Sequence, residues 1–273
     1  MQQVMLAQRI AAGGGSGLPP TTYAGLTYWY DGDNSAHYTG NADNTGAPTN
    51  GGSFTRHDSV ASISRILIDA SMVRRIPVVG ASAGYDIDLS FAGSIGGSFY
   101  VKPAAGAGYT TPVTLGSLVT ASAKAFTVAI KVNSAPAAAA NPYDNALIFG
   151  DANIYFGCFV YSQSGAARFM ALNYDGTYDQ AVAVGPTLGS WAIVTFRHSS
   201  GSLRARVNGG AWTSIASGNT SDVTQNAIMH NYLPSANPLD ADIAQFCTYN
   251  VARTDAELLE IERYFGAKVG ITI

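Results

Sequence analysis

Residues 191–212 read WAIVTFRHSSGSLRARVNGGAW and carry the clearest strand pattern in the chain. The first run, 191–197, is rich in β-branched and aromatic residues, which favour strands. The second run, 203–207, leads into Asn208-Gly209, and Asn-Gly is the strongest short-range signal for a β-hairpin. This stretch therefore predicts two strands followed by a hairpin turn, after which the chain returns over 211–215.

Short strand-like runs recur before this stretch, and turn residues separate them. They are 85–91, 98–102, 112–119, 126–132, 146–149, 154–161 and 166–173. In the first of them Tyr85, Ile87, Leu89 and Phe91 alternate with polar residues, as in a half-buried strand. Regularly spaced short strands predict an all-β sandwich or barrel. Residues 31–60 have almost no aliphatic side chains and are expected to form a surface loop, whereas 62–79 fits a helix or a strand equally well.

One helix is expected near the C-terminus. Thr254 and Glu257 have the spacing of a capping box, in which each side chain accepts a hydrogen bond from the other residue's backbone N–H. Leu258, Ile261 and Phe265 then recur on one helical face. Either of two glycines, at 266 and 270, can end the helix.

Composition narrows the classes of partner. The 273 residues are 47% hydrophobic and 12% charged, with a formal net charge of −3. No basic cluster is present to neutralise phosphates, so nucleic acid is not expected as a partner. No run of about 18 apolar residues is present, so no membrane span is expected. Cys158 and Cys247 lie in apolar runs and are expected to be buried free thiols, with a disulfide as the alternative in an oxidising compartment.

Residues 1–20 differ from the rest of the chain. Four apolar side chains come first, then a flexible glycine-rich stretch (13–17) and a stiff Pro19-Pro20 pair. The apolar side chains are those of Val4, Met5, Leu6 and Ile10. We interpret 1–20 as an attachment arm with its linker and 21–273 as one domain. A terminus that frays, or that packs back on its own domain, explains the same residues. No secretory signal is visible at the start, which favours folding in a cytoplasm.

The region from about 125 to 273 resembles the laminin-G-like, concanavalin-A-like jelly roll. The resemblance rests on the strands 126–132 and 191–196, the 203–209 strand with its Asn-Gly turn, the 241–250 strand and the helix and tail 253–271. It implies a two-sheet antiparallel jelly-roll sandwich with one short C-terminal helix. With this ending, the chain resembles single-domain members of the family that occur on bacteriophage particles and bacterial surfaces. The resemblance therefore implies a role in a virion.

Some members of this family are glycoside hydrolases, which carry Glu-x-Asp-x-Glu along one strand to flank the sugar bond. Here all three glutamates, Glu257, Glu260 and Glu262, lie in the expected helix. Asp86 and Asp88 are the only same-face acidic pair on an expected strand, and a solvated strand face explains them. No Gly-x-Ser-x-Gly motif and no zinc-like histidine spacing is present. We therefore expect no catalytic residue.

Two kinds of ligand site remain open. Loop carboxylates bind calcium in sandwich lectins, and the candidates are Asp31, Asp33, Asp175 and Asp179. Turn chemistry alone also favours such residues in loops. Sugar binding needs exposed aromatic rings beside polar groups. The best cluster is Tyr174, Asp175 and Tyr178, followed by Tyr143 and Asp144.

The sequence as a whole favours a non-enzymatic virion structural protein, a phage decoration or fibre-like module. It would bind capsid or tail proteins through residues 1–20 and would have the capacity to bind glycans. The alternative is a lectin-like adhesion module outside a virion, and a glycoside hydrolase ranks third. A homo-oligomer is compatible with either of the first two interpretations.

Overall fold

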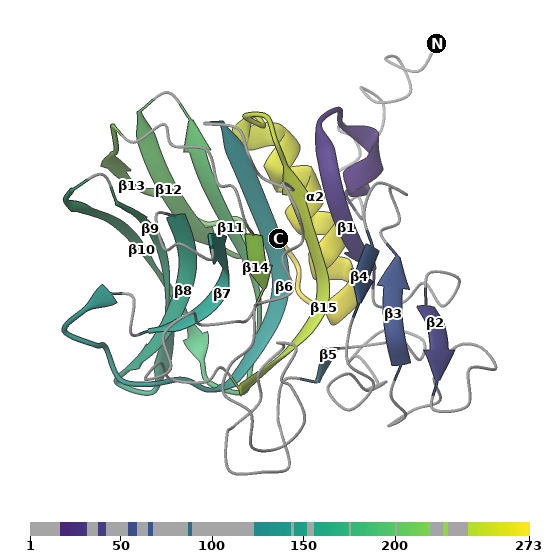
Figure 1. Ribbon diagram of the computed structural model, residues 1–273, viewed down its shortest axis with the longest axis horizontal. Helices are drawn as coiled ribbons and strands as arrows, with labels where there is room; N and C mark the ends of the chain where they lie inside the picture. Colours follow the sequence, from purple (N-terminus) through teal and green to yellow (C-terminus); the bar gives the residue numbers. More distant parts are fainter. Residues whose placement is uncertain are drawn as a thin grey trace.

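Two antiparallel β-sheets face one another, and one helix lies against the outer side of the larger sheet (Figure 1). This confirms the predicted jelly-roll sandwich with a short C-terminal helix. The computed structural model describes residues 17–31, 38–41, 54–58, 65–67, 87–88, 123–142, 145–151, 156–174, 176–199, 201–218, 226–228 and 240–273. In this part of the chain, no helix is both long and apolar enough to cross a membrane.

The larger sheet follows the order β1-β15-β6-β11-β12-β13, and β5 also pairs with β15. Its strands are β1 (Leu26–Asp31), β5 (Ile87–Asp88), β6 (Lys124–Ser134), β11 (Trp191–Ser199), β12 (Ser202–Val207), β13 (Thr213–Ala216) and β15 (Asp240–Tyr249). The strand β15 comes last along the chain, yet it lies between β1 and β6. The larger sheet is therefore complete only when distant segments meet.

The smaller sheet follows the order β10-β9-β8-β7-β14. Its strands are β7 (Ala146–Asp151), β8 (Phe156–Gln163), β9 (Ala166–Tyr174), β10 (Tyr178–Thr187) and β14 (Asn226–Ile228). Four of them follow one another as simple hairpins, which agrees with the short strands expected over 146–173. The strand β10 was not expected, because small alanines occupy its inward positions and weaken the alternation.

A third sheet contains β2 (Tyr38–Asn41), β3 (Phe54–Asp58) and β4 (Arg65–Leu67). The expectation that residues 31–60 form only a loop was therefore wrong, because β2 and β3 pair within them. Polar residues surround these strands, but each contains β-prone residues such as Thr39 and Phe54. Of the strands expected over 85–119, only Ile87–Asp88 belongs to the described residues.

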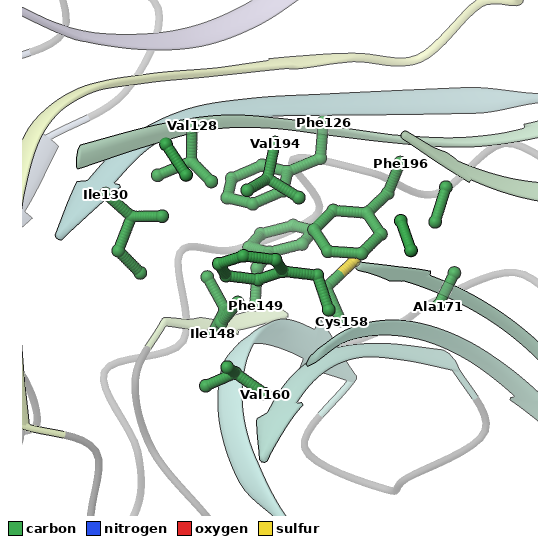
Figure 2. Packing of buried hydrophobic residues seen from close by; sticks show 14 of the residues in the cluster. Phe126, Val128, Ile130, Ile148, Phe149, Cys158, Val160, Ala171, Val194 and Phe196 are labelled. Carbon is green, nitrogen blue, oxygen red and sulfur yellow. The ribbon is translucent and has the colours of Figure 1, made fainter. Parts of the chain in front are cut away.

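The core between the two sheets is aromatic at its centre. Phe126 of β6 stacks on Phe149 of β7, with ring centroids 4.7 Å apart, and Phe196 of β11 lies 6.1 Å from Phe126 (Figure 2). All three rings are at most 3% exposed. The opposite face of the larger sheet is also buried, because Ile193 and its neighbours pack under the helix. Burial on both faces explains why these strands are apolar almost without interruption.

The helix α2 (Asp255–Val269) begins as predicted. The Thr254 side chain accepts a hydrogen bond from Glu257 N at 3.2 Å, and the Glu257 carboxylate accepts one from Thr254 N at 2.8 Å. Gly270 ends the helix with φ +74°. The other predicted end point, Gly266, lies inside the helix. A Cβ there would be 2.6 Å from the Ile271 carbonyl oxygen, so Gly266 lets the tail fold back on the helix.

Buried and half-buried charges attach α2 to the larger sheet. Arg206 Nε donates to Glu262 Oε1 at 2.7 Å, and the two residues are 5% and 0% exposed. Trp212 covers the Arg206 guanidinium, with 4.2 Å from Arg206 Cζ to the ring centroid. Arg197 also pairs with Asp255 in the first helical turn. Burial raises the pKa of Glu262 above its ordinary value of 4.5 and outweighs the opposing attraction of Arg206.

The predicted Asn-Gly hairpin is confirmed. Asn208 and Gly209 have φ values of +50° and +68°, and Gly210 N donates to Val207 O at 3.0 Å across the turn. The side-chain oxygen of Asn208 also accepts from Ile193 N at 2.7 Å, so the turn is attached to β11. The two cysteines are free and buried, as expected, and burial raises the pKa of both thiols.

The end of the predicted arm lies on the domain. Leu18 N donates to Glu260 O at 3.2 Å, and the Tyr249 hydroxyl donates to Pro20 O at 2.7 Å. A Cβ on Gly17 would lie 2.2 Å from Glu260 O, so only glycine allows the chain this close to α2. A 3₁₀ turn, η1 (Pro20–Thr22), follows. Residues 17–20 therefore pack on α2 and β15, while Val4, Met5, Leu6 and Ile10 lie outside the described residues.

Candidate functional site

The structure brings together two tyrosines of the predicted sugar site. Tyr174 ends β9, Tyr178 begins β10, and the two residues are directly opposite each other in the antiparallel pairing. Their ring centroids are 4.9 Å apart, with an angle of 38° between the rings. Tyr178 is 44% exposed and Tyr174 is half-buried. The pair therefore forms an aromatic surface that solvent reaches.

Residues 173–174 and 178–179 are paired at the end of a β-hairpin. Asn173 pairs with Asp179, one position inside the tyrosine pair. Side chains alternate across a strand, so Asn173 and Asp179 lie on the inner face while Tyr174 and Tyr178 lie on the outer one. Asn173 Nδ2 donates to Ser217 Oγ at 2.7 Å, a buried bond that ties this end of the smaller sheet to the end of the larger one. The tyrosine pair is thereby held on rigid backbone.

The outer face of β8, β9 and β10 continues away from the tyrosines. Its centre is buried and apolar, with Phe159, Met170 and Leu172 at most 1% exposed. Towards the β10 edge it becomes exposed, and Gln180 lies opposite Leu172, next to the tyrosines on the same face. Gln180 was missed because β10 was not recognised as a strand. The signal that could have identified this strand is the alternation of longer side chains at 178, 180, 182 and 184 with shorter ones at 179, 181 and 183.

The other predicted sugar residues lie outside the described residues. Along the sequence, Asp175 falls between the two tyrosines, and Tyr143 and Asp144 precede β7. The described part of the site therefore consists of Tyr174, Tyr178 and Gln180.

The calcium candidates fall on different sheets. Asp31 ends β1, where it pairs with Gln245, at one edge of the larger sheet. Asp179 belongs to β10 at the edge of the smaller sheet and shares its inner face with buried Ala181. Asp33 and Asp175 are outside the described residues. Among the residues that are described, no group of three or more His, Cys, Asp or Glu could hold a metal ion.

The glutamates are engaged in the attachment and capping of α2. Glu257 caps the helix and pairs with Arg253 at 3.6 Å, Glu260 pairs with Arg263 at 2.6 Å, and Glu262 is buried against Arg206. Asp88 belongs to the short strand β5 and pairs with Asp242, while Asp86 lies outside the described residues. The described glutamates thus stabilise the helix against the sheet.

Some solved structures are similar to this chain at low sequence identity. The chain is similar to domain 4 of an extracellular arabinanase from Geobacillus stearothermophilus in complex with arabinotriose, with 14% identity and a TM-score of 0.43 over 66% of this chain and 88% of that one. It is also similar to the binding domain of botulinum neurotoxin DC in complex with SialylT, with 14% identity and a TM-score of 0.44. That match covers 66% of this chain and 42% of the toxin domain, so this chain spans less than half the toxin domain's length.

Sequence comparison assigns the family. Curated proteins show no match to this sequence. A family model matches residues 106–259, which include β6 to β15 and the first turn of α2. The model describes the concanavalin A-like lectin/glucanases superfamily. Because the match covers more than half of the chain and agrees with the two-sheet fold, the chain belongs to the concanavalin A-like lectin/glucanases superfamily.

Proposed function

We propose that this chain is a non-enzymatic carbohydrate-binding domain and that the Tyr174–Tyr178 pair is its sugar-binding surface. The observation that carries the proposal is the pair itself, two rings 4.9 Å apart with Tyr178 exposed on the outer face of a rigid hairpin. Aromatic rings offer an apolar stacking face to a sugar, and polar neighbours direct its hydroxyl groups. Gln180 supplies an amide on the same face. Membership of a family named after lectins and glucanases makes sugars the ligand class to test.

The engagement of the glutamates favours binding over hydrolysis. A glycoside hydrolase needs a carboxylic acid and a carboxylate on either side of the scissile bond. Here the three glutamates of α2 pair with Arg253, Arg263 and Arg206. The helix lies against the larger sheet and not against the face of the tyrosine pair. The calcium candidates of this hairpin are Asp175 and Asp179, and Asp179 lies on the inner face, opposite to the face of the tyrosine pair. A glycan screen with and without a chelator tests directly whether binding requires calcium.

Replacing Tyr178 with alanine is expected to weaken glycan binding about tenfold or more, since one stacking ring is lost. Tyr174→Ala should have a similar effect, because the two rings contact each other. A glycan array would first identify a ligand, and calorimetry would then give the dissociation constants. Tyr178→Phe is the matched control, because it keeps the ring and should keep most of the affinity. If Tyr178→Ala binds as tightly as the unchanged chain, the tyrosine pair is not the site.

A second proposed role is that of a virion structural protein, a phage decoration or fibre-like module attached through residues 1–20. The observation behind it is the packing of residues 17–20 on α2 and β15, which fixes the end of the predicted arm at one place on the domain. The strand β1, next to this packing, lies at the opposite end of the larger sheet from β13 and thus on the far side from β10 (Figure 1). An attached domain would therefore present the tyrosine pair away from the particle.

Changing Val4 and Leu6 together to aspartate is expected to abolish attachment to virus particles assembled without this protein. Charges at these positions would remove the apolar contact that the arm offers. Co-sedimentation with such particles measures the effect, and the unchanged chain should pellet. The matched control changes Gln2 and Gln3 to aspartate, which adds the same charge without removing apolar side chains. If the unchanged chain stays in solution, the attachment role is wrong, whereas the sugar-binding proposal is unaffected.

A further inference from the structure

The exposed apolar side chains gather at one edge of the sandwich. Among the described residues, three large hydrophobic side chains are exposed, namely Tyr178 at 44%, Val184 at 64% and Ile215 at 38%. The first two belong to β10, the edge strand of the smaller sheet, and the third belongs to β13, the edge strand of the larger sheet. These two edge strands lie near each other on the same side of the molecule (Figure 1). Clustering of this kind marks an interaction surface.

The strand β10 lacks the usual protection of an edge. Natural edge strands are blunted by lysines, prolines or bulges, because their backbone groups on the open side can pair with another chain. Residues 178–184 contain no lysine, arginine or proline. Pro186 and a shift of register between Val184 and Thr187 come only at the far end. The stretch from Tyr178 to Val184 is therefore regular, and among the described residues no strand pairs with its other side.

We propose that β10 pairs in antiparallel fashion with β10 of a second copy, about a two-fold axis at Ala181. Ala181 is the midpoint of the regular stretch. In this register every residue from Tyr178 to Val184 is therefore paired, and the pairing ends before the bulge. It places Tyr178 directly opposite the partner's Val184, and these are the two exposed apolar side chains of the strand. Both lie on the outer face, because they are an even number of positions apart along the strand. Each copy thus brings its exposed side chains beside those of the other within the sheet, as an isologous interface requires.

The charges of the strand are compatible with this register. Asp179 is the only charged residue between Tyr178 and Thr187. In the proposed pairing it lies opposite the partner's Ala183, four residues along the strand from the partner's Asp179, or about 13 Å at the usual rise of a strand. The two carboxylates are then farther apart than the screening length of about 8 Å at physiological salt. No like charges are opposed, so the strand is complementary to itself.

Such a dimer would join the two smaller sheets into one continuous sheet. An in-plane antiparallel pairing keeps the outer faces on one side, so both Tyr174–Tyr178 pairs would face the same way. Two weak sites on one rigid particle bind a multivalent surface more tightly than either alone. The dimer itself does not depend on the proposed sugar binding.

The first test measures self-association of the full chain by sedimentation velocity over about 1 to 100 µM, the range in which weak dimers form. The unchanged chain should form dimers, and Val184→Asp should weaken dimerisation about tenfold or more, because it places a charge against Tyr178 of the partner. Ala256→Asp is the matched control, since it adds the same charge at an exposed position on α2. Monomers throughout the series, or equal weakening by the two variants, would overturn the proposal.

The second test examines the register with cysteines. In a strand pair, directly opposite residues have Cα atoms about 4.5–5.5 Å apart, which a disulfide spans. The double variant Tyr178→Cys with Val184→Cys should therefore form a covalent dimer on mild oxidation. Val184→Cys alone should not, because its thiol is six residues out of register with its copy. The native Cys158 and Cys247 are buried and free. Equal crosslinking of the single and double variants on a non-reducing gel would show that the register is wrong.

Discussion

Phe126→Ala is expected to lower the free energy of unfolding by about 3–5 kcal/mol, the usual cost of deleting a buried phenylalanine ring. Phe126 lies at the centre of the sandwich, where it stacks on Phe149 at 4.7 Å and contacts Phe196 at 6.1 Å and Phe246 at 6.2 Å between centroids (Figure 2). These rings come from both sheets, so the cavity left by alanine would weaken the packing of one sheet against the other. Chemical denaturation followed by tryptophan fluorescence measures the change.

The control for this variant is Ile215→Val, which also shortens an apolar side chain but on the surface. Ile215 is 38% exposed, so the change should stay within about 0.5 kcal/mol. Phe126→Leu should cost less than Phe126→Ala, because it leaves a smaller cavity. A loss below about 1 kcal/mol for Phe126→Ala would mean that the ring cluster does not hold the sheets together.

Arg206→Ala is expected to lower the free energy of unfolding by about 3–5 kcal/mol, because it leaves the buried Glu262 carboxylate without its charged partner. Glu262 is fully buried and Arg206 nearly so, and the 2.7 Å hydrogen bond between them joins α2 to β12. Removing the arginine also removes the packing of its guanidinium on Trp212. Thermal and chemical denaturation at neutral pH would show the loss.

The loss of stability caused by Arg206→Ala should become smaller as the pH falls. Burial already raises the pKa of Glu262 above 4.5, and without Arg206 the pKa should rise further. A carboxyl group with a raised pKa in the folded state is destabilising when it is charged. Its penalty therefore disappears as pH falls through the folded-state pKa towards the unfolded value of 4.5. A penalty that stays constant from neutral pH down to about pH 4.5, the unfolded value, would contradict this explanation.

Arg204→Ala is the matched control for the ion pair. Arg204 lies on the same strand and the same face, but it is 33% exposed and 3.9 Å from the Asp255 carboxylate. Exposed ion pairs contribute about 1 kcal/mol or less, so this variant should be nearly neutral. The double change Arg206→Met with Glu262→Leu should recover most of the stability, because it buries no charge. Loss of folding in this double variant would show that the pair has a role that apolar packing cannot replace.

The elements that could be predicted are those whose signals are local. The strands around Phe126 and Trp191 were visible because both of their faces are buried, so nearly every residue is apolar. The Asn208-Gly209 turn and the Thr254–Glu257 capping box depend on neighbouring residues and were confirmed. The strand β10 was missed because Ala181 and Ala183 are too small to mark an inward face. The tyrosine pair was proposed because aromatic residues stand beside polar ones in the sequence, and the structure places the two rings on paired strands.

The sequence by itself determined the fold class, the helix with its cap, the hairpin turn and the candidate tyrosines. Each depends on backbone conformation or hydrogen bonds between residues close in the chain, which short patterns encode. The tertiary structure alone decided which of these elements meet. Arg206 and Glu262 are 56 positions apart, and β15 pairs with β1 from the other end of the chain. Such contacts form because apolar faces are buried together in one particular strand order, and no local pattern specifies which charged or aromatic residues that order brings into contact.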